Sequence, residues 1–244
     1  MIVKSLQKLS SNQAFQQSCA KHKIGAMKTC MCSFVIIIYA LLLGTTASAL
    51  ATPASLSVSN IIKQGLNKIR LGNPEQALLD ARKAIEMDSN NANAYFLLGR
   101  AQQDLGLKSE SIISYNKAIF INSNYVAAYS NRGLIKGGLG DIKGAIKDFD
   151  RAIQIDGSFA AAYLNRGVAA GALGKSGQAL ADFSSAIKIN SKYTDAYLNR
   201  GISRELIGDI KGACEDWKKA SSLGSADANK WYTKQCLARI PIKN

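Results

Sequence analysis

Apolar and small residues follow one pattern that returns every 34 residues between Val58 and Asp227. Within each copy they are spaced three or four residues apart in two stretches, and polar residues fill the positions between them. Residues at this spacing lie on one face of an α-helix. Each copy therefore predicts two amphipathic helices that form one helical hairpin. The five copies cover residues 58–91, 92–125, 126–159, 160–193 and 194–227.

Five positions carry the pattern, counted from the first residue of each copy. Position 8 is glycine in every copy, position 27 is alanine, and position 20 is alanine or serine. Position 4 is large, and holds Ile61, Tyr95, Tyr129, Tyr163 and Tyr197. Position 24 holds Ala81, Tyr115, Phe149, Phe183 and Trp217. Small residues at positions 8 and 20 allow two helices to approach closely, and the large residues fill the space between hairpins.

A glycine at position 15 of each copy predicts the turn between the two helices, because glycine adopts the left-handed conformation that closes a helix. Asn73, Asp141 and Asp209 follow this glycine in three copies. We expect these short polar side chains to cap the second helix of the hairpin.

A repeat of this length predicts a solenoid rather than a globular domain. One hairpin cannot bury its apolar face alone, so neighbouring copies must stack and leave a long groove along one side. The predicted fold is therefore all-α, a row of stacked helical hairpins.

The pattern at positions 4, 8, 20, 24 and 27 resembles the tetratricopeptide repeat, and the resemblance covers residues 58–227. It implies a right-handed superhelix whose first helices line a concave side, chiefly through positions 2, 5, 6, 9, 12 and 13. Two departures concern the finer geometry. The proline that the family often has at position 32 is missing from every copy, and position 11 lacks the family's aromatic residue: it holds Lys68, Gln102, Lys136, Ala170 and Arg204.

The segment after the fifth copy, residues 228–244, begins like another first helix and then stops. Trp231 stands at its position 4, but Gln235 replaces the glycine of position 8, which is needed only where a second helix follows. We expect a capping helix with one apolar side against the last hairpin.

The first 51 residues have the order of an export signal, and a short linker, residues 52–57, joins them to the first copy. Lysines precede the apolar run Phe34–Leu43, and small residues then supply Ala47-Ser48-Ala49 and Ala49-Leu50-Ala51. Basic, apolar and A-x-A segments in this order predict a secretory signal helix, separate from the solenoid. Met27 is an alternative start. The other interpretation is an uncleaved membrane anchor, since residues 30–51 carry no charge. We therefore expect an exported protein (in a periplasm, a lumen or the medium), with membrane contact only if the leader is uncleaved.

Charge adds little to this picture. The chain has a net charge of +14, but five of its 31 basic residues precede Ala51, which leaves 26 basic against 17 acidic residues. The remaining lysines are spread through the copies and form no block, so we do not expect nucleic-acid binding.

Arginine at position 7 accompanies aspartate at position 23 in the last three copies. The pairs are Arg132 with Asp148, Arg166 with Asp182, and Arg200 with Asp216. The second copy has neither charge, whereas the first has Gln64 with Asp80. We interpret each pair as a structural ion pair between the two helices of a hairpin. Two independent solvated charges are the alternative.

Two cysteines follow the leader, Cys214 at position 21 of the fifth copy and Cys236 in the cap. In the oxidising compartment that an exported protein reaches, a disulfide between them would fix the cap to the last hairpin. Two buried thiols that act as small apolar residues are the alternative.

The sequence gives little support to an enzyme. Its one histidine, His22, lies in the leader, so residues 52–244 cannot form a Ser-His or Cys-His pair and lack the commonest metal ligand. The glycines follow the structural period and form no phosphate-binding loop. We predict no catalytic residues, no metal and no cofactor.

The candidate binding residues are asparagines at position 6, Asn131, Asn165 and Asn199. An amide both donates and accepts hydrogen bonds, so three of them in successive copies can hold the backbone of an extended peptide. This is similar to the asparagine ladder of superhelical members of the family, which implies a protein or peptide partner. The alternative is that asparagine is merely common at this position. The family's lysine-rich clamp for a terminal carboxylate is not expected, because positions 5 and 9 are mostly apolar.

Overall fold

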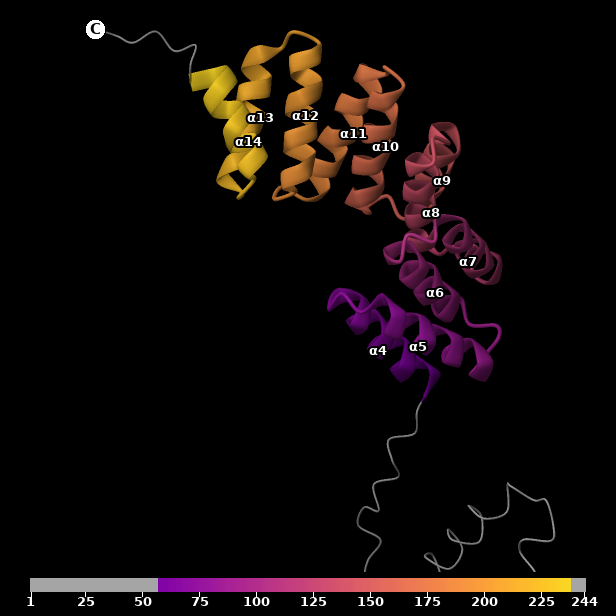
Figure 1. Cartoon of the computed structure of the whole chain (residues 1–244). Helices are drawn as coiled ribbons and strands as arrows, with labels where there is room; N and C mark the ends of the chain where they lie inside the picture. The colour runs from indigo at the N-terminus through magenta and orange to yellow at the C-terminus, as the bar shows by residue number, and fades with distance from the viewer. Residues whose placement is uncertain (1–56, 238–244) are drawn as a thin grey trace, which may run out of the picture. The chain divides into compact units, whose positions relative to one another are not determined.

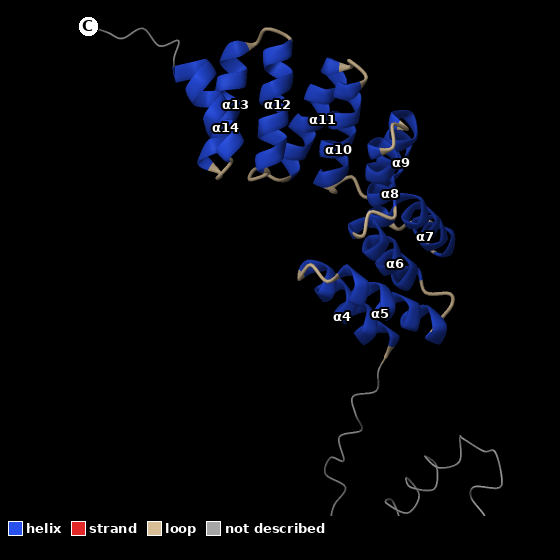
Figure 2. Cartoon of the chain, viewed as in Figure 1, coloured by secondary structure: helices blue, strands red, loops and turns tan. Residues whose placement is uncertain are grey.

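The computed structural model describes residues 57–237, in which every regular element is a helix (Figure 2). Helices α4 to α13 pair as five successive hairpins, and α14 follows them. Their bounds are α4 Val58–Arg70, α5 Pro74–Met87, α6 Ala92–Asp104, α7 Lys108–Ile121, α8 Val126–Gly138, α9 Ile142–Ile155, α10 Ala160–Ala172, α11 Ser176–Ile189, α12 Thr194–Leu206, α13 Ile210–Ser222 and α14 Ala226–Trp231. The predicted all-α fold is confirmed. The predicted leader, residues 1–51, lies outside the described part of the chain.

The chain divides into two units, Met1–Ser55 and Leu56–Asn244, and the described residues belong to the second. In this unit the hairpins follow one another in chain order (Figure 1). Each first helix also contacts the first helix of the next hairpin, from α4 against α6 to α10 against α12. The first helices thus lie side by side along one face of the row, which we call the inner face. Between residues 57 and 237, no helix combines the length and the apolar character needed to cross a membrane.

Glycine makes each turn within a hairpin. The five glycines at position 15 have φ between 71° and 88°, a left-handed conformation that closes the first helix. Asp141 and Asp209 then cap the second helix, since each carboxylate accepts a hydrogen bond from a backbone N–H three residues on, at 2.9 Å. The prediction for Asn73 is wrong, because its side chain makes no capping bond. Its backbone φ is −114°, against −78° and −79° at Asp141 and Asp209.

The glycine at position 8 packs against the large residue at position 24 of the same hairpin. A Cβ atom on Gly133 would lie 2.7 Å from the Phe149 ring, and Gly99, Gly167 and Gly201 face Tyr115, Phe183 and Trp217 in the same way. The first hairpin differs, because its position 24 is Ala81. There Leu97, from the next hairpin, occupies the space in front of Gly65 and is fully buried.

The segment after the last hairpin closes the row. Helix α14 continues as a π-helix over Tyr232–Cys236. Trp231 packs on Trp217 with ring centroids 5.3 Å apart, and a disulfide joins Cys214 to Cys236, whose Cα atoms are 5.8 Å apart. These contacts attach the segment to α13, so the apolar side of the fifth hairpin is covered.

Candidate peptide-binding groove

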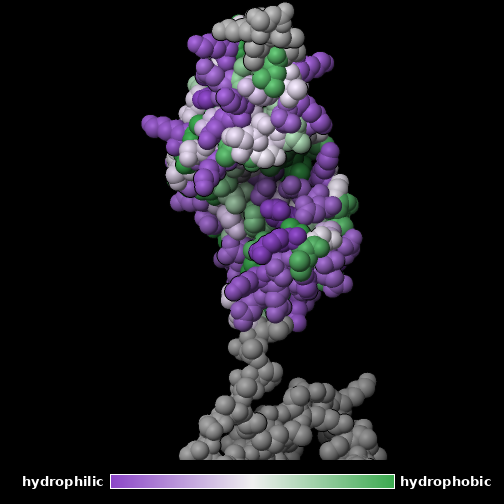
Figure 3. All heavy atoms as spheres, turned by 90° about the vertical axis from the view of Figure 1, so that its left-hand side faces the viewer, coloured by the Kyte–Doolittle hydropathy of each residue, from purple (hydrophilic) through white to green (hydrophobic). Residues whose placement is uncertain are grey.

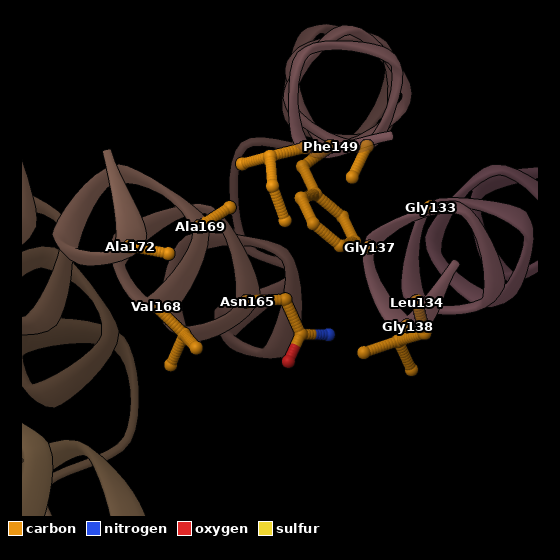
Figure 4. Close-up of a pocket in the computed structure, with 11 residues that line it drawn as sticks. Gly133, Leu134, Gly137, Gly138, Phe149, Asn165, Val168, Ala169 and Ala172 are labelled. Atoms are coloured by element: carbon orange, nitrogen blue, oxygen red, sulfur yellow. The ribbon is translucent and has the colours of Figure 1, made fainter. Parts of the chain in front are cut away.

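A cleft of about 210 Å³ opens on the inner face between α8 and α10, with α9 behind it (Figure 4). Its lining is almost entirely apolar or small: Gly133, Leu134, Gly137, Gly138, Ile142, Ala145, Phe149, Asn165, Val168, Ala169 and Ala172. The cleft is open to solvent, and Leu134 and Val168 at its mouth are 42% and 48% exposed. In Figure 3, which looks onto this side, hydrophobic surface lies in a hollow bordered by hydrophilic residues.

Glycine creates the cleft on the α8 side. A Cβ atom on Gly138 would meet nothing within 4 Å, and one on Gly137 would only touch Ala145 at 3.7 Å. Side chains at these two positions would therefore fill the hollow without disturbing the helix packing. No neighbouring helix packs into the space that the missing side chains leave, so this space is open to a ligand.

Asn165 is the one polar side chain of the lining, and its amide projects from α10 towards α8 across the mouth of the cleft (Figure 4). It is half-buried, as is Asn131 at the same position of α8. The third predicted residue differs, because the Asn199 amide donates a hydrogen bond to the Asp195 carbonyl of its own helix at 2.8 Å. Asn165 is thus the predicted asparagine that lines this cleft.

The charges along the inner face are unevenly distributed. At the six groove positions the first two copies carry Lys63, Arg70, Arg100 and Asp104, and the fifth carries Asp195 and Glu205. The third and fourth copies carry no charge at these positions. A ligand that crosses the middle of the inner face therefore meets small, apolar and amide groups only.

The three predicted arginine–aspartate pairs form in the structure, and each is bidentate. Arg166 binds Asp182 through Nε at 3.0 Å and Nη2 at 2.6 Å, and the other two pairs have nearly the same geometry. The aspartates are buried, with exposed fractions of 2% to 4%. The hydrogen bond to Asp182 raises the pKa of the Arg166 guanidinium above its ordinary value. Because both charges are paired within the hairpin, their role is structural.

Sequence reasoning missed the third contact of each arginine. The free Nη1 reaches back to position 25 of the preceding hairpin, where Arg166 meets Asp150 at 2.6 Å. Arg132 meets Asn116 and Arg200 meets Ser184 in the same way. Each guanidinium also lies over the tyrosine three residues before it, 5.4 to 5.6 Å from the ring centroid. One side chain thus ties two helices of its own hairpin to the hairpin before it.

In four of the five copies position 11 supplies a partner for position 23; the exception is Ala170 in the fourth. Lys136 and Arg204 each add an ion pair at 2.9 Å to the buried aspartate of their hairpin. In the first hairpin Lys68 pairs with Asp80 at 2.7 Å, in place of the absent arginine. In the second, Gln102 accepts a hydrogen bond from Ser114 at 2.6 Å. A comparison of positions 11 and 23 across the copies could have revealed this.

Among residues 57–237, no group of three or more His, Cys, Asp or Glu side chains is placed to hold a metal ion. The titratable groups with shifted pKa values are mostly tyrosines in the core: burial raises the pKa of Tyr125 to about 12 and also raises that of Tyr115.

Comparison with known proteins agrees with this architecture. Profiles of the tetratricopeptide repeat match residues 62–126, 126–159 and 160–193, which together are more than half of the chain. The protein belongs to the tetratricopeptide repeat family. Members of this family are protein-interaction scaffolds, and the fold defines the present chain as one. A search of curated protein sequences gave no match.

Similar solved structures come from several proteins of this fold. MamA is 25% identical with a TM-score of 0.58, over 68% of this chain and 96% of that one. Pseudomonas aeruginosa pilF is 19% identical with a TM-score of 0.67, over 75% and 90%. YrrB, described as a TPR protein with an unusual peptide-binding site, is 21% identical with a TM-score of 0.57, over 71% and 90%. At these identities the likeness concerns the fold.

Proposed function

We propose that this protein is a non-catalytic scaffold or assembly factor that holds an extended segment of a partner protein in the groove of its inner face. The observation that carries the proposal is the cleft between α8 and α10, which places an unfilled apolar hollow beside the Asn165 amide. An apolar side chain of the partner enters the hollow, while the amide binds the partner's backbone. Asn131 extends the contact to the preceding hairpin, and Asn199, whose amide nitrogen already donates to the Asp195 carbonyl, extends it to the next through its free oxygen.

The size of the site suits a short extended segment. Hairpin layers are about 10 Å apart, so three asparagines span about 20 Å, or about six residues at roughly 3.3 Å each. Main-chain recognition of this kind is tolerant of sequence, and the apolar hollow supplies the selectivity. Nucleic acid is not the expected ligand, because the middle of the inner face carries no basic side chain that could contact phosphates.

We also propose that the protein works outside the reducing cytosol, after export by its N-terminal leader or while anchored by it. The disulfide between Cys214 and Cys236 supports this, since disulfides persist in oxidising compartments. Intact-mass measurement of the protein purified from its own cells distinguishes a cleaved leader from a retained one. A cytosolic protein of full mass in which Cys214 and Cys236 are free thiols would contradict export.

The groove is tested by filling the cleft. Peptides selected from a random displayed library on the wild-type protein are measured by calorimetry against Gly138→Leu, in which a leucine side chain occupies the hollow. Gly177→Leu is the matched control, because Gly177 lies on α11, and a Cβ there also meets nothing within 4 Å. We expect at least a tenfold loss of affinity for Gly138→Leu and no loss for Gly177→Leu. Equal affinities would rule out the cleft as the binding site.

A further inference from the structure

Arg100 breaks the apolar row of the inner face. It stands on α6 at position 9, where the other copies have Leu66, Leu134, Val168 and Ile202. By the period of 34 residues Arg100 corresponds to Leu134, which lines the cleft between α8 and α10. By this correspondence we expect Arg100 to border the equivalent space between α6 and α8, with Asn131 opposite it.

The guanidinium of Arg100 lacks the partners that Arg132, Arg166 and Arg200 have. Its Nε is buried without a hydrogen-bond acceptor among the described residues. An unpaired buried donor costs about 1–3 kcal/mol, and more when it is charged, so such a group calls for an explanation. One explanation is that a ligand supplies the acceptor. The location supports this explanation, because the Arg100 side chain is only half-buried and stands at a groove position.

Other polar side chains of α6 are bound elsewhere or form no ion pair with Arg100. The Gln103 carbonyl oxygen accepts a hydrogen bond from the Tyr115 hydroxyl at 2.8 Å, and Asn93 accepts one from Tyr125 at 2.7 Å. Asp104, one turn further along α6, is exposed and forms no ion pair with Arg100 within 4 Å. Phe96, one turn before Arg100 on α6, packs against both tyrosine rings.

We infer that Arg100 binds an acidic side chain of the partner segment, one hairpin away from the apolar residue that enters the cleft. The inference rests on the proposed function, since both contacts belong to one extended ligand. A hairpin spacing of about 10 Å corresponds to about three residues of extended chain. The partner motif is thus one apolar and one acidic residue, about three positions apart, joined by uncharged residues that cross the charge-free middle of the groove.

Synthetic peptides test this motif directly. Acetylated, amidated peptides of serine, alanine and threonine carry one leucine and, three positions before or after it, either glutamate or glutamine. Their affinities are measured by amide chemical-shift titration of the wild-type protein, Arg100→Gln, Arg100→Lys and Gly138→Leu. We expect glutamate to bind about five- to tenfold more tightly than glutamine in one of the two orders. Arg100→Gln should remove this preference, Arg100→Lys should retain part of it, and added salt should weaken it.

The outcomes separate the two proposals. If glutamate and glutamine peptides bind the wild-type protein equally in both orders while Gly138→Leu still blocks them, the role of Arg100 is wrong and the groove stands. If Gly138→Leu leaves binding unchanged, or if no leucine peptide binds the wild-type protein, both proposals fail. A glutamate preference that survives in Arg100→Gln would also overturn the inference. Circular dichroism of each variant confirms that the helices are intact.

Discussion

Leu97 occupies, from the second hairpin, the space that Ala81 leaves in the first. In the other hairpins a large side chain at position 24 packs against the glycine at position 8, but here Leu97 packs against Gly65 from the neighbouring hairpin. Leu97 stands at position 6, where the last three copies carry the asparagines of the groove. The second hairpin thus uses for packing a position at which the last three carry asparagine, whereas Lys63 at this position of the first hairpin is exposed.

Substitution of Leu97 should therefore reduce stability. We expect Leu97→Asn to lower the free energy of unfolding by about 3 kcal/mol or more, because it leaves a cavity and buries an amide. Ala81→Phe alone should also destabilise, since the ring would collide with Leu97. The double variant should recover much of the loss, because it restores the pairing of the later hairpins. Urea unfolding of all four proteins measures the coupling; additive losses would contradict the relationship.

The buried ion pairs make a second prediction. The substitution Arg166→Ala leaves the Asp182 carboxylate buried and unpaired, and should lower the free energy of unfolding by about 3–5 kcal/mol. The double substitution Arg166→Leu with Asp182→Ser copies the Leu98–Ser114 pair of the second hairpin and should lower the free energy of unfolding by clearly less. Denaturant unfolding distinguishes the two cases. If the single variant were as stable as the double one, the charges would be solvated and independent.

The disulfide should stabilise the last hairpin. Cys214 and Cys236 are 22 residues apart, and closure of a loop of this size is worth roughly 3 kcal/mol in the chain-entropy model. Cys236→Ser should therefore lower the stability of α13 and α14, observed as faster hydrogen exchange there than in α8 and α10. Unchanged exchange in the last hairpin would show that the contact between Trp217 and Trp231 holds the cap without the bond.

Alkaline pH should weaken the second hairpin. Burial raises the pKa of Tyr125 to about 12 from its ordinary value of 10.0. Because the unfolded chain loses this proton first, the stabilisation is complete below pH 10 and is lost as the pH rises through 12. Tyr115 acts in the same direction. Ultraviolet titration of tyrosinate should show late-ionising tyrosines that Tyr125→Phe reduces by one; ionisation of every tyrosine near pH 10 would contradict this.

Much of this fold is predictable because the five copies of the repeat can be compared with one another. Periodicity predicted hairpins over 58–227, and the correlation of positions 7 and 23 identified the paired charges. Contacts between copies were harder to predict, because no single copy contains both partners. The hydrogen bond from Arg166 to Asp150 and the packing of Leu97 on Gly65 both depend on how the hairpins stack. Glycine at positions 137 and 138 is visible in the sequence, but the cleft that these two residues line is not. Its position beside Asn165, and not beside Asn199, follows from the stacking geometry of α8 against α10.

The central claim is that the inner face between α8 and α10 receives a ligand, and amide chemical-shift mapping tests it most directly. With a library-selected peptide added, the account predicts the largest changes at the backbone amides of Gly137, Gly138 and Val168 and at the side-chain amide of Asn165. Signals from the second helices of the hairpins, including that of Gly177 on α11, should stay fixed. Large changes confined to these second helices, with the signals of α8 and α10 unmoved, would contradict the account.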